Sequence, residues 1–128
     1  MVVAVTEGVK ISVFSLFEER MSAAPQGSFV FSYRISIENQ NDYPIQLLRR
    51  HWFVTDSNGL KREIEGPGVI GEQPVIAPGE NFSYTSACDL QSPFGIMKGF
   101  YSMQMKGVSS LFKVQVPEFS LEADFMKN

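Results

Sequence analysis

Strict alternation of apolar and polar residues, in short segments separated by turns, restricts the possible fold more than any other pattern in the sequence. The clearest case is FVFSYRISIE at residues 29–38, where Phe29, Phe31, Tyr33, Ile35 and Ile37 alternate with Ser32, Arg34, Ser36 and Glu38. A period of two predicts a β-strand with one buried face and one face in water. VKISVF and NFSYTSACDL alternate in the same way and are expected to form strands too.

The segment IQLLRRHWFVTD follows a cluster of turn residues at 39–44 and is expected to form a long strand. Its adjacent Leu47 and Leu48 indicate a bulge, where the alternation slips by one residue. In the second half, Trp52 and Arg50 share one face, whereas Arg49 and His51 share the other. The following Asp-Ser-Asn-Gly predicts a hairpin into LKREIE, because Asn-Gly readily adopts positive φ.

Two further strands are expected in IMKGFYSMQM and LFKVQVPEFSL, joined by a hairpin at residues 106–108. Pro117 lacks a backbone donor, so the last strand should bulge or change partner there. The segment LFEERMSAA is expected to be a mobile loop rather than a helix, because no window keeps a helical period for three turns.

These seven or eight short antiparallel strands, spaced about ten residues apart, predict an all-β sandwich of immunoglobulin or fibronectin-III type. The 128 residues are expected to form a single domain, 1–128. A single cysteine excludes an internal disulfide and suits a reducing compartment. With no apparent signal peptide and no apolar run near the ~20 residues that cross a bilayer, we expect a cytoplasmic protein that does not bind membranes.

The net charge of −3 makes nucleic-acid binding through the phosphate backbone improbable. The one dense basic cluster is Arg49-Arg50-His51. One interpretation is that Trp52 fills the core while the arginine stems cover apolar surface. The other is that Arg49 and His51 are displayed on a sheet face for an acidic partner.

Gly66, Gly68 and Gly71 have the G-x-G-x-x-G spacing of a phosphate-binding turn. That motif binds phosphate by opening a helix, whose N-terminus supplies free N–H groups. Here Pro74 and the Pro78-Gly79 turn prevent a helix, so residues 71–80 should be extended. The segment is therefore interpreted as a structural or partner-facing loop, or as an anion-binding turn that uses its amides and a nearby arginine.

Few residues suit catalysis or metal binding. One histidine and one cysteine cannot form a zinc site of Cys/His type, and no serine can be assigned to His51 as a nucleophile. Cys88 lies on the apolar face of its strand. We predict no catalytic residue, metal site or cofactor, with a loose site for a hard cation as a minor alternative, using some of Asp56, Glu63, Glu65 and Glu72.

The segments LLRRHWFVTDSNG, GPGVIGEQPVIAPGENFSYTSACDL and SPFGIMKGFY resemble the ApaG family, from about Val9 to the closing VPEFSLEA. The resemblance implies an immunoglobulin/fibronectin-III-like sandwich. Some family members are associated with cobalt and magnesium resistance. Related domains in eukaryotic F-box proteins and in a polymerase-interacting protein look like interaction modules. No catalytic residues carry over, and the family's glycine motif has prompted proposals of pyrophosphate binding.

The first functional hypothesis is a non-enzymatic protein-interaction module, with the loop Glu65–Glu80 as its surface and Gly68, Val69 and Ile70 near the tip. The alternative is a binder of small anions, such as pyrophosphate or a nucleotide, through Gly66–Gly71. Exposed strand edges would also allow a homodimer.

Overall fold

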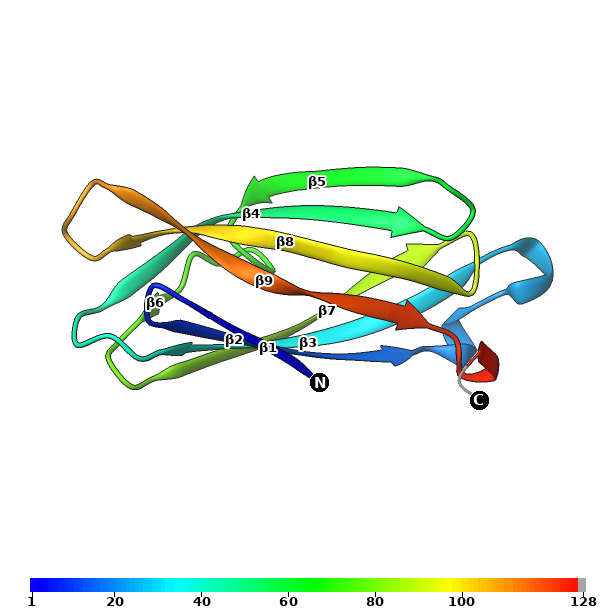
Figure 1. Ribbon diagram of the computed structural model, residues 1–128, viewed down its shortest axis with the longest axis horizontal. Helices are drawn as coiled ribbons and strands as arrows, with labels where there is room; N and C mark the ends of the chain where they lie inside the picture. The colour runs from blue at the N-terminus through cyan, green and yellow to red at the C-terminus, as the bar shows by residue number, and fades with distance from the viewer. Residues whose placement is uncertain (127–128) are drawn as a thin grey trace.

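The computed structural model describes residues 1–126, and the described chain is built almost entirely of strands in two antiparallel sheets (Figure 1). The first sheet has the order β1(Val2–Thr6), β2(Val9–Phe17), β3(Phe29–Asn39), β7(Asn81–Leu90). The second has the order β5(Lys61–Pro67), β4(Ile45–Asp56), β8(Phe94–Met105), β9(Leu111–Glu122), with the short β6(Val75–Ile76) also paired to β4. The predicted all-β sandwich is confirmed.

The core lies between the two sheets and includes the apolar face that the alternation assigned to β3. Phe31, Ile35 and Ile37 of β3 are buried, and so are most inward-facing residues of β2 and β7. Trp52 of β4 is buried as well, with its ring centroid 5.7 Å from that of Tyr33. Burial of these apolar faces is the main stabilising contribution of the sandwich.

Both predicted irregularities are present. The pairing of β4 with β8 shifts register between Leu47 and Arg49, which makes Leu48 the extra residue of a bulge. The pairing of β8 with β9 shifts between Met97 and Gly99, opposite Pro117 and Glu118. The proline thus lies where its missing N–H removes no ladder hydrogen bond.

The structure adds detail that the sequence did not provide. The described residues form nine strands, more than the seven or eight expected, because Val2–Thr6 and Val75–Ile76 are strands as well. The segment 16–24 is neither one loop nor an α-helix. It completes β2 and then makes the short 3₁₀ turns Glu19–Met21 and Ala24–Gln26.

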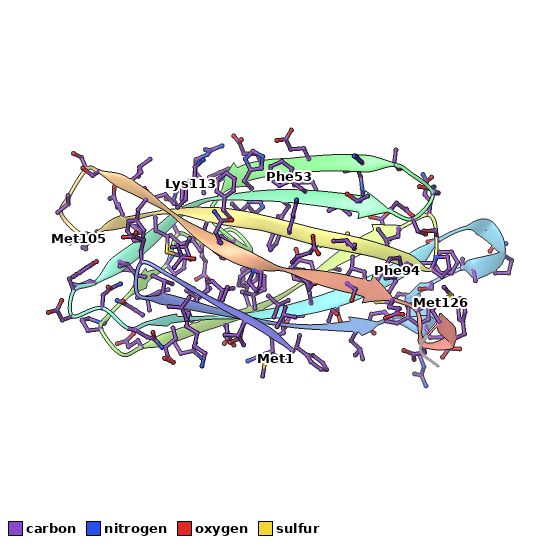
Figure 2. The ribbon with its side chains drawn as sticks, viewed as in Figure 1. Met1, Phe53, Phe94, Met105, Lys113 and Met126 are labelled. Carbon is purple, nitrogen blue, oxygen red and sulfur yellow. The ribbon has the colours of Figure 1, made fainter. Side chains whose placement is uncertain are left out.

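The two long sides of the sandwich differ. On one side β9 packs against β1 and β2 (Figure 1). There the amide of Gln115 donates to Thr6 Oγ1 over 3.3 Å. On the other side β5 and β7 are the last strands of their sheets, and each has an unpaired edge. Phe94 and Met126 lie at one end of the molecule and Met105 at the other (Figure 2). No helix among residues 1–126 is long and apolar enough to cross a membrane.

Candidate functional site

The glycine segment is a tight hairpin at the end of β5. Val69 and Glu72 exchange two backbone hydrogen bonds, of 2.8 and 2.9 Å, across the central residues Ile70 and Gly71. Both central residues have positive φ, 43° and 78°, as a type I′ turn requires. No helix begins at Gly71, so the helix dipole that a dinucleotide-binding turn supplies is absent here.

Each glycine of the motif has a structural role of its own. A Cβ at Gly66 would lie 3.1 Å from both terminal nitrogens of Arg50, so this glycine leaves room for the guanidinium. Gly68 has φ 61°, and a side chain there would collide with the backbone oxygen of Glu72. Gly71 has open space around it and is required only for its positive φ.

The two residues expected at the exposed tip of the loop point in opposite directions. Ile70 is 56% exposed, as expected of a partner-facing residue, but Val69 is 1% exposed and belongs to the hydrophobic core. The expectation that Val69 lies on the surface is therefore wrong. The reversal of chain direction in the turn places one apolar side chain between the sheets and the next one in solvent.

The outer surface of the hairpin offers little to an anion. A shallow hollow there is lined by Pro67, Gly68, Gly71, Glu72 and Gln73, of which none is basic and one is acidic. The amides of Gly68, Val69 and Glu72 are already hydrogen-bonded to backbone oxygens. Within residues 66–72, few donors remain for a phosphate.

Arg49 and His51 lie together on the outer face of β4, as the alternation predicted, and each has acidic partners on β5. Arg49 pairs with Glu65 over 3.1 Å. The His51 ring contacts Glu63 and Glu65 through its two nitrogens, at 2.6 and 3.1 Å. The ring also stacks between Phe53 and Phe100, with centroids 4.7 and 4.9 Å away.

These contacts satisfy both basic residues within the protein. The carboxylates of Glu63 and Glu65 neutralise the positive charge to which an acidic partner would bind. Both ring nitrogens of His51 are already in contact with these carboxylates. Lys113 of β9 lies beside this stack of rings, with its Nζ 4.5 Å from the centre of the Phe100 ring. Figure 2 labels Phe53 and Lys113, which belong to the same sheet.

A cleft of about 330 Å³ lies on the open side of the sandwich, between β5 and β7. Trp52, Val69 and Met97 contribute apolar surface, and Ile70 and Gly71 of the hairpin also line it. Its polar lining residues include Arg50, Arg62, Tyr33, Tyr84, Ser86 and Asp89. The glycine hairpin thus forms one wall of a cleft, instead of forming a site by itself.

Arg50 and Arg62 enter the cleft from the second sheet. Arg62 reaches across to β7, where it donates to the backbone oxygen of Asp89, contacts the Asp89 carboxylate at 3.4 Å and approaches Cys88 Sγ at 3.5 Å. Alternation placed Arg50 on the same face as Trp52, where its stem was expected to cover apolar surface. The face that Arg50 shares with Trp52 indicates that its side chain lies at the inner side of the sheet, where the cleft is.

Buried hydroxyl and thiol groups border the cleft. Burial raises the pKa of Tyr33, and more strongly that of Tyr84, while the charge of Arg50 opposes both shifts weakly. The Tyr84 hydroxyl lies 2.5 Å from that of Tyr101, whose pKa burial also raises. Burial raises the pKa of the Cys88 thiol, so little reactive thiolate forms at neutral pH. No group of three metal-ligating side chains occurs in the described chain.

A family model described as the ApaG domain matches residues 19–105. Proteins named ApaG from Beijerinckia indica and Maricaulis maris are 43% and 46% identical to the chain. These alignments cover 96% and 90% of this chain, and 94% and 88% of the relatives. The chain belongs to the ApaG family.

The fold agrees with solved structures. The crystal structure of the putative ApaA protein from Bordetella pertussis superposes with a TM-score of 0.87 at 37% identity, covering 91% of this chain and 94% of that one. A protein from Archaeoglobus fulgidus, with 9% identity and a TM-score of 0.52, shares the fold alone. The ApaG resemblance drawn from the sequence motifs is therefore confirmed.

Proposed function

We propose that this ApaG domain is a non-enzymatic module that binds an extended segment of another protein in the cleft between β5 and β7. The observation that carries the proposal is the conformation of Ile70. A β-branched residue at positive φ is strained, by about 1–2 kcal/mol, and Ile70 adopts φ 43° with its side chain exposed beside the cleft. Strained residues of this kind concentrate at functional sites.

The strand edges around the cleft support this function. Both β5 and β7 end their sheets with one unpaired edge, and such edges accept an added strand through backbone hydrogen bonds. The cleft between them supplies pockets for alternate side chains of that strand. Either a different protein or a second copy of the chain could supply the added strand.

The occupied nitrogens of His51 and the buried, protonated thiol of Cys88 support a binding role over catalysis. The cytoplasmic location and the link to cobalt and magnesium tolerance are further parts of the proposal. Deletion of the gene should then reduce growth on elevated cobalt, and a copy that carries Ile70→Asp should fail to restore it.

Photo-crosslinking in the native cell tests the binding surface directly. A photoreactive residue at Ala87, which is exposed on β7 and lines the cleft, should give a discrete crosslinked protein. The control position is Phe14, which is 54% exposed on the outer face of the first sheet. Equal crosslinking from both positions, or none from Ala87, would overturn the proposal. A product of twice the chain's mass would identify a homodimer.

A further inference from the structure

Arg50 is held in the cleft by one end of its guanidinium group only. Its Nη1 donates to the backbone oxygens of Pro67 and Gly68, over 2.9 and 3.1 Å. The group lies against Gly66, where a Cβ would be 3.1 to 3.2 Å from Nη1, Nη2 and Cζ alike. The arginine is therefore fixed in orientation by backbone contacts that leave its charge uncompensated.

Arg50 has no carboxylate partner among residues 1–126, whereas Arg49 and Arg62 each have one. Arg49 pairs with Glu65 at 3.1 Å, and Arg62 pairs with Asp89 at 3.4 Å. A partly buried cation without a counter-ion is costly, because burial weakens its hydration. Such a group binds an anion more readily than one that is already paired.

Two donors of Arg50 are free, and the residue lines the cleft. In the described chain, Nε and Nη2 have no acceptor, and no fully buried side-chain nitrogen is left without one. These two atoms are therefore accessible, and Arg50 lines the cleft. Nε and Nη2 form one edge of the guanidinium plane, and such an edge pairs with both oxygens of a carboxylate or phosphate.

The other residues that line the cleft indicate which chemical group could bind beside an anion at Arg50. Trp52, Ile64 and Met97 provide apolar surface, and the volume of about 330 Å³ exceeds what a single phosphate would fill. The charged lining residues are Arg50, Arg62 and Asp89, which leave one positive charge in excess. The cleft therefore matches an anionic group that is attached to an apolar one.

We infer that Arg50 is the anchor for an oxyanion, a carboxylate or a phosphate ester, carried next to an apolar group on the bound segment. The inference rests on the proposed function, because it names what a partner inserts into the cleft. It places the anion on the Arg50 side chain, on the cleft side of the hairpin, and not on the amides of Gly66–Gly71.

An NMR titration of the full-length chain tests this with small probes. N-acetylphenylalanine supplies the carboxylate, phenyl phosphate supplies the phosphate, and N-acetylphenylalanine amide is the uncharged control. At least one anion should shift the Arg50 Nε and Trp52 indole signals at millimolar concentration, and the amide should not. Which anion binds identifies the source of the charge. Absence of shifts with both anions, or equal shifts with the amide, would refute the inference.

Variants distinguish the guanidinium edge from charge alone. Arg50→Lys keeps the charge but loses the paired donors, so affinity for the bound anion should fall about tenfold or more. Arg49→Gln, the adjacent arginine on the opposite face, should leave affinity unchanged. If Arg50→Lys does not fold, Arg62→Gln, which removes the second cleft cation, should lower affinity severalfold. Shifts confined to Glu72 and Gln73 and insensitive to these variants would instead place the anion on the glycine hairpin.

The outcome separates this inference from the proposed function. Crosslinking from Ala87 without any anion binding would leave the interaction module in place and remove the anchor. Anion binding at Arg50 without crosslinking would keep the anchor and remove the protein partner.

Discussion

The guanidinium of Arg50 lies flat against Gly66, with both terminal nitrogens 3.1 Å from the position that a Cβ would occupy. Gly66 is paired with Arg50 in the ladder between β4 and β5, so the glycine and the arginine it accommodates are direct cross-strand neighbours. The first glycine of the motif thus serves an arginine of the protein, rather than the phosphate of a ligand.

Gly68→Ala should destabilise the protein much more than Gly71→Ala. Both positions have positive φ, which costs alanine about 1–2 kcal/mol. At Gly68 the methyl group would also collide with the Glu72 backbone, so the total should reach about 3 kcal/mol. Urea unfolding of the two variants measures the difference. Equal losses of stability would contradict the assigned roles.

The burial of Val69 gives a second stability test. Val69→Ala removes two core methyl groups and should lower the free energy of unfolding by about 2 kcal/mol. Val75→Ala is the matched control, because Val75 is 47% exposed on the edge strand β6, and it should cost less than about 0.5 kcal/mol. A tolerated Val69→Ala would mean that the side chain does not fill the core.

The hairpin and the strands that flank it show how much of the fold could be predicted from the sequence. Alternation identified the core faces of β3 and β4, since burial of one sheet face dictates a period of two. The prolines after Gly71 excluded a helix. Burial of Val69 was not predictable, because a two-residue turn reverses the chain and ends the alternation. The cleft depends on Arg62 meeting Cys88 and Asp89 of β7, a distant part of the chain, and a local sequence pattern does not report such a contact.

Stability should fall at alkaline pH because of the buried tyrosines. Burial raises the pKa of Tyr84 and Tyr101 in the folded state, whereas in the unfolded chain it stays near 10. Their contribution is complete below that pH and is lost as the pH rises above it, because only the unfolded chain then releases the protons. Urea unfolding between about pH 9 and 11 should show a steeper loss for the wild type than for Tyr84→Phe. Parallel losses would assign the effect to other groups.

Ile70→Asn tests the central claim most directly, because it separates stability from binding at one position. Asparagine tolerates the positive φ and would form the Asn-Gly pair that type I′ turns favour, so the variant should be about 1 kcal/mol more stable, with a melting temperature about 4 °C higher. The same change removes an exposed apolar contact beside the cleft, so crosslinking from Ala87 should decrease. A more stable variant with weaker crosslinking is the result we predict. A variant that is more stable and crosslinks as well as the wild type would contradict a binding role for the strained isoleucine.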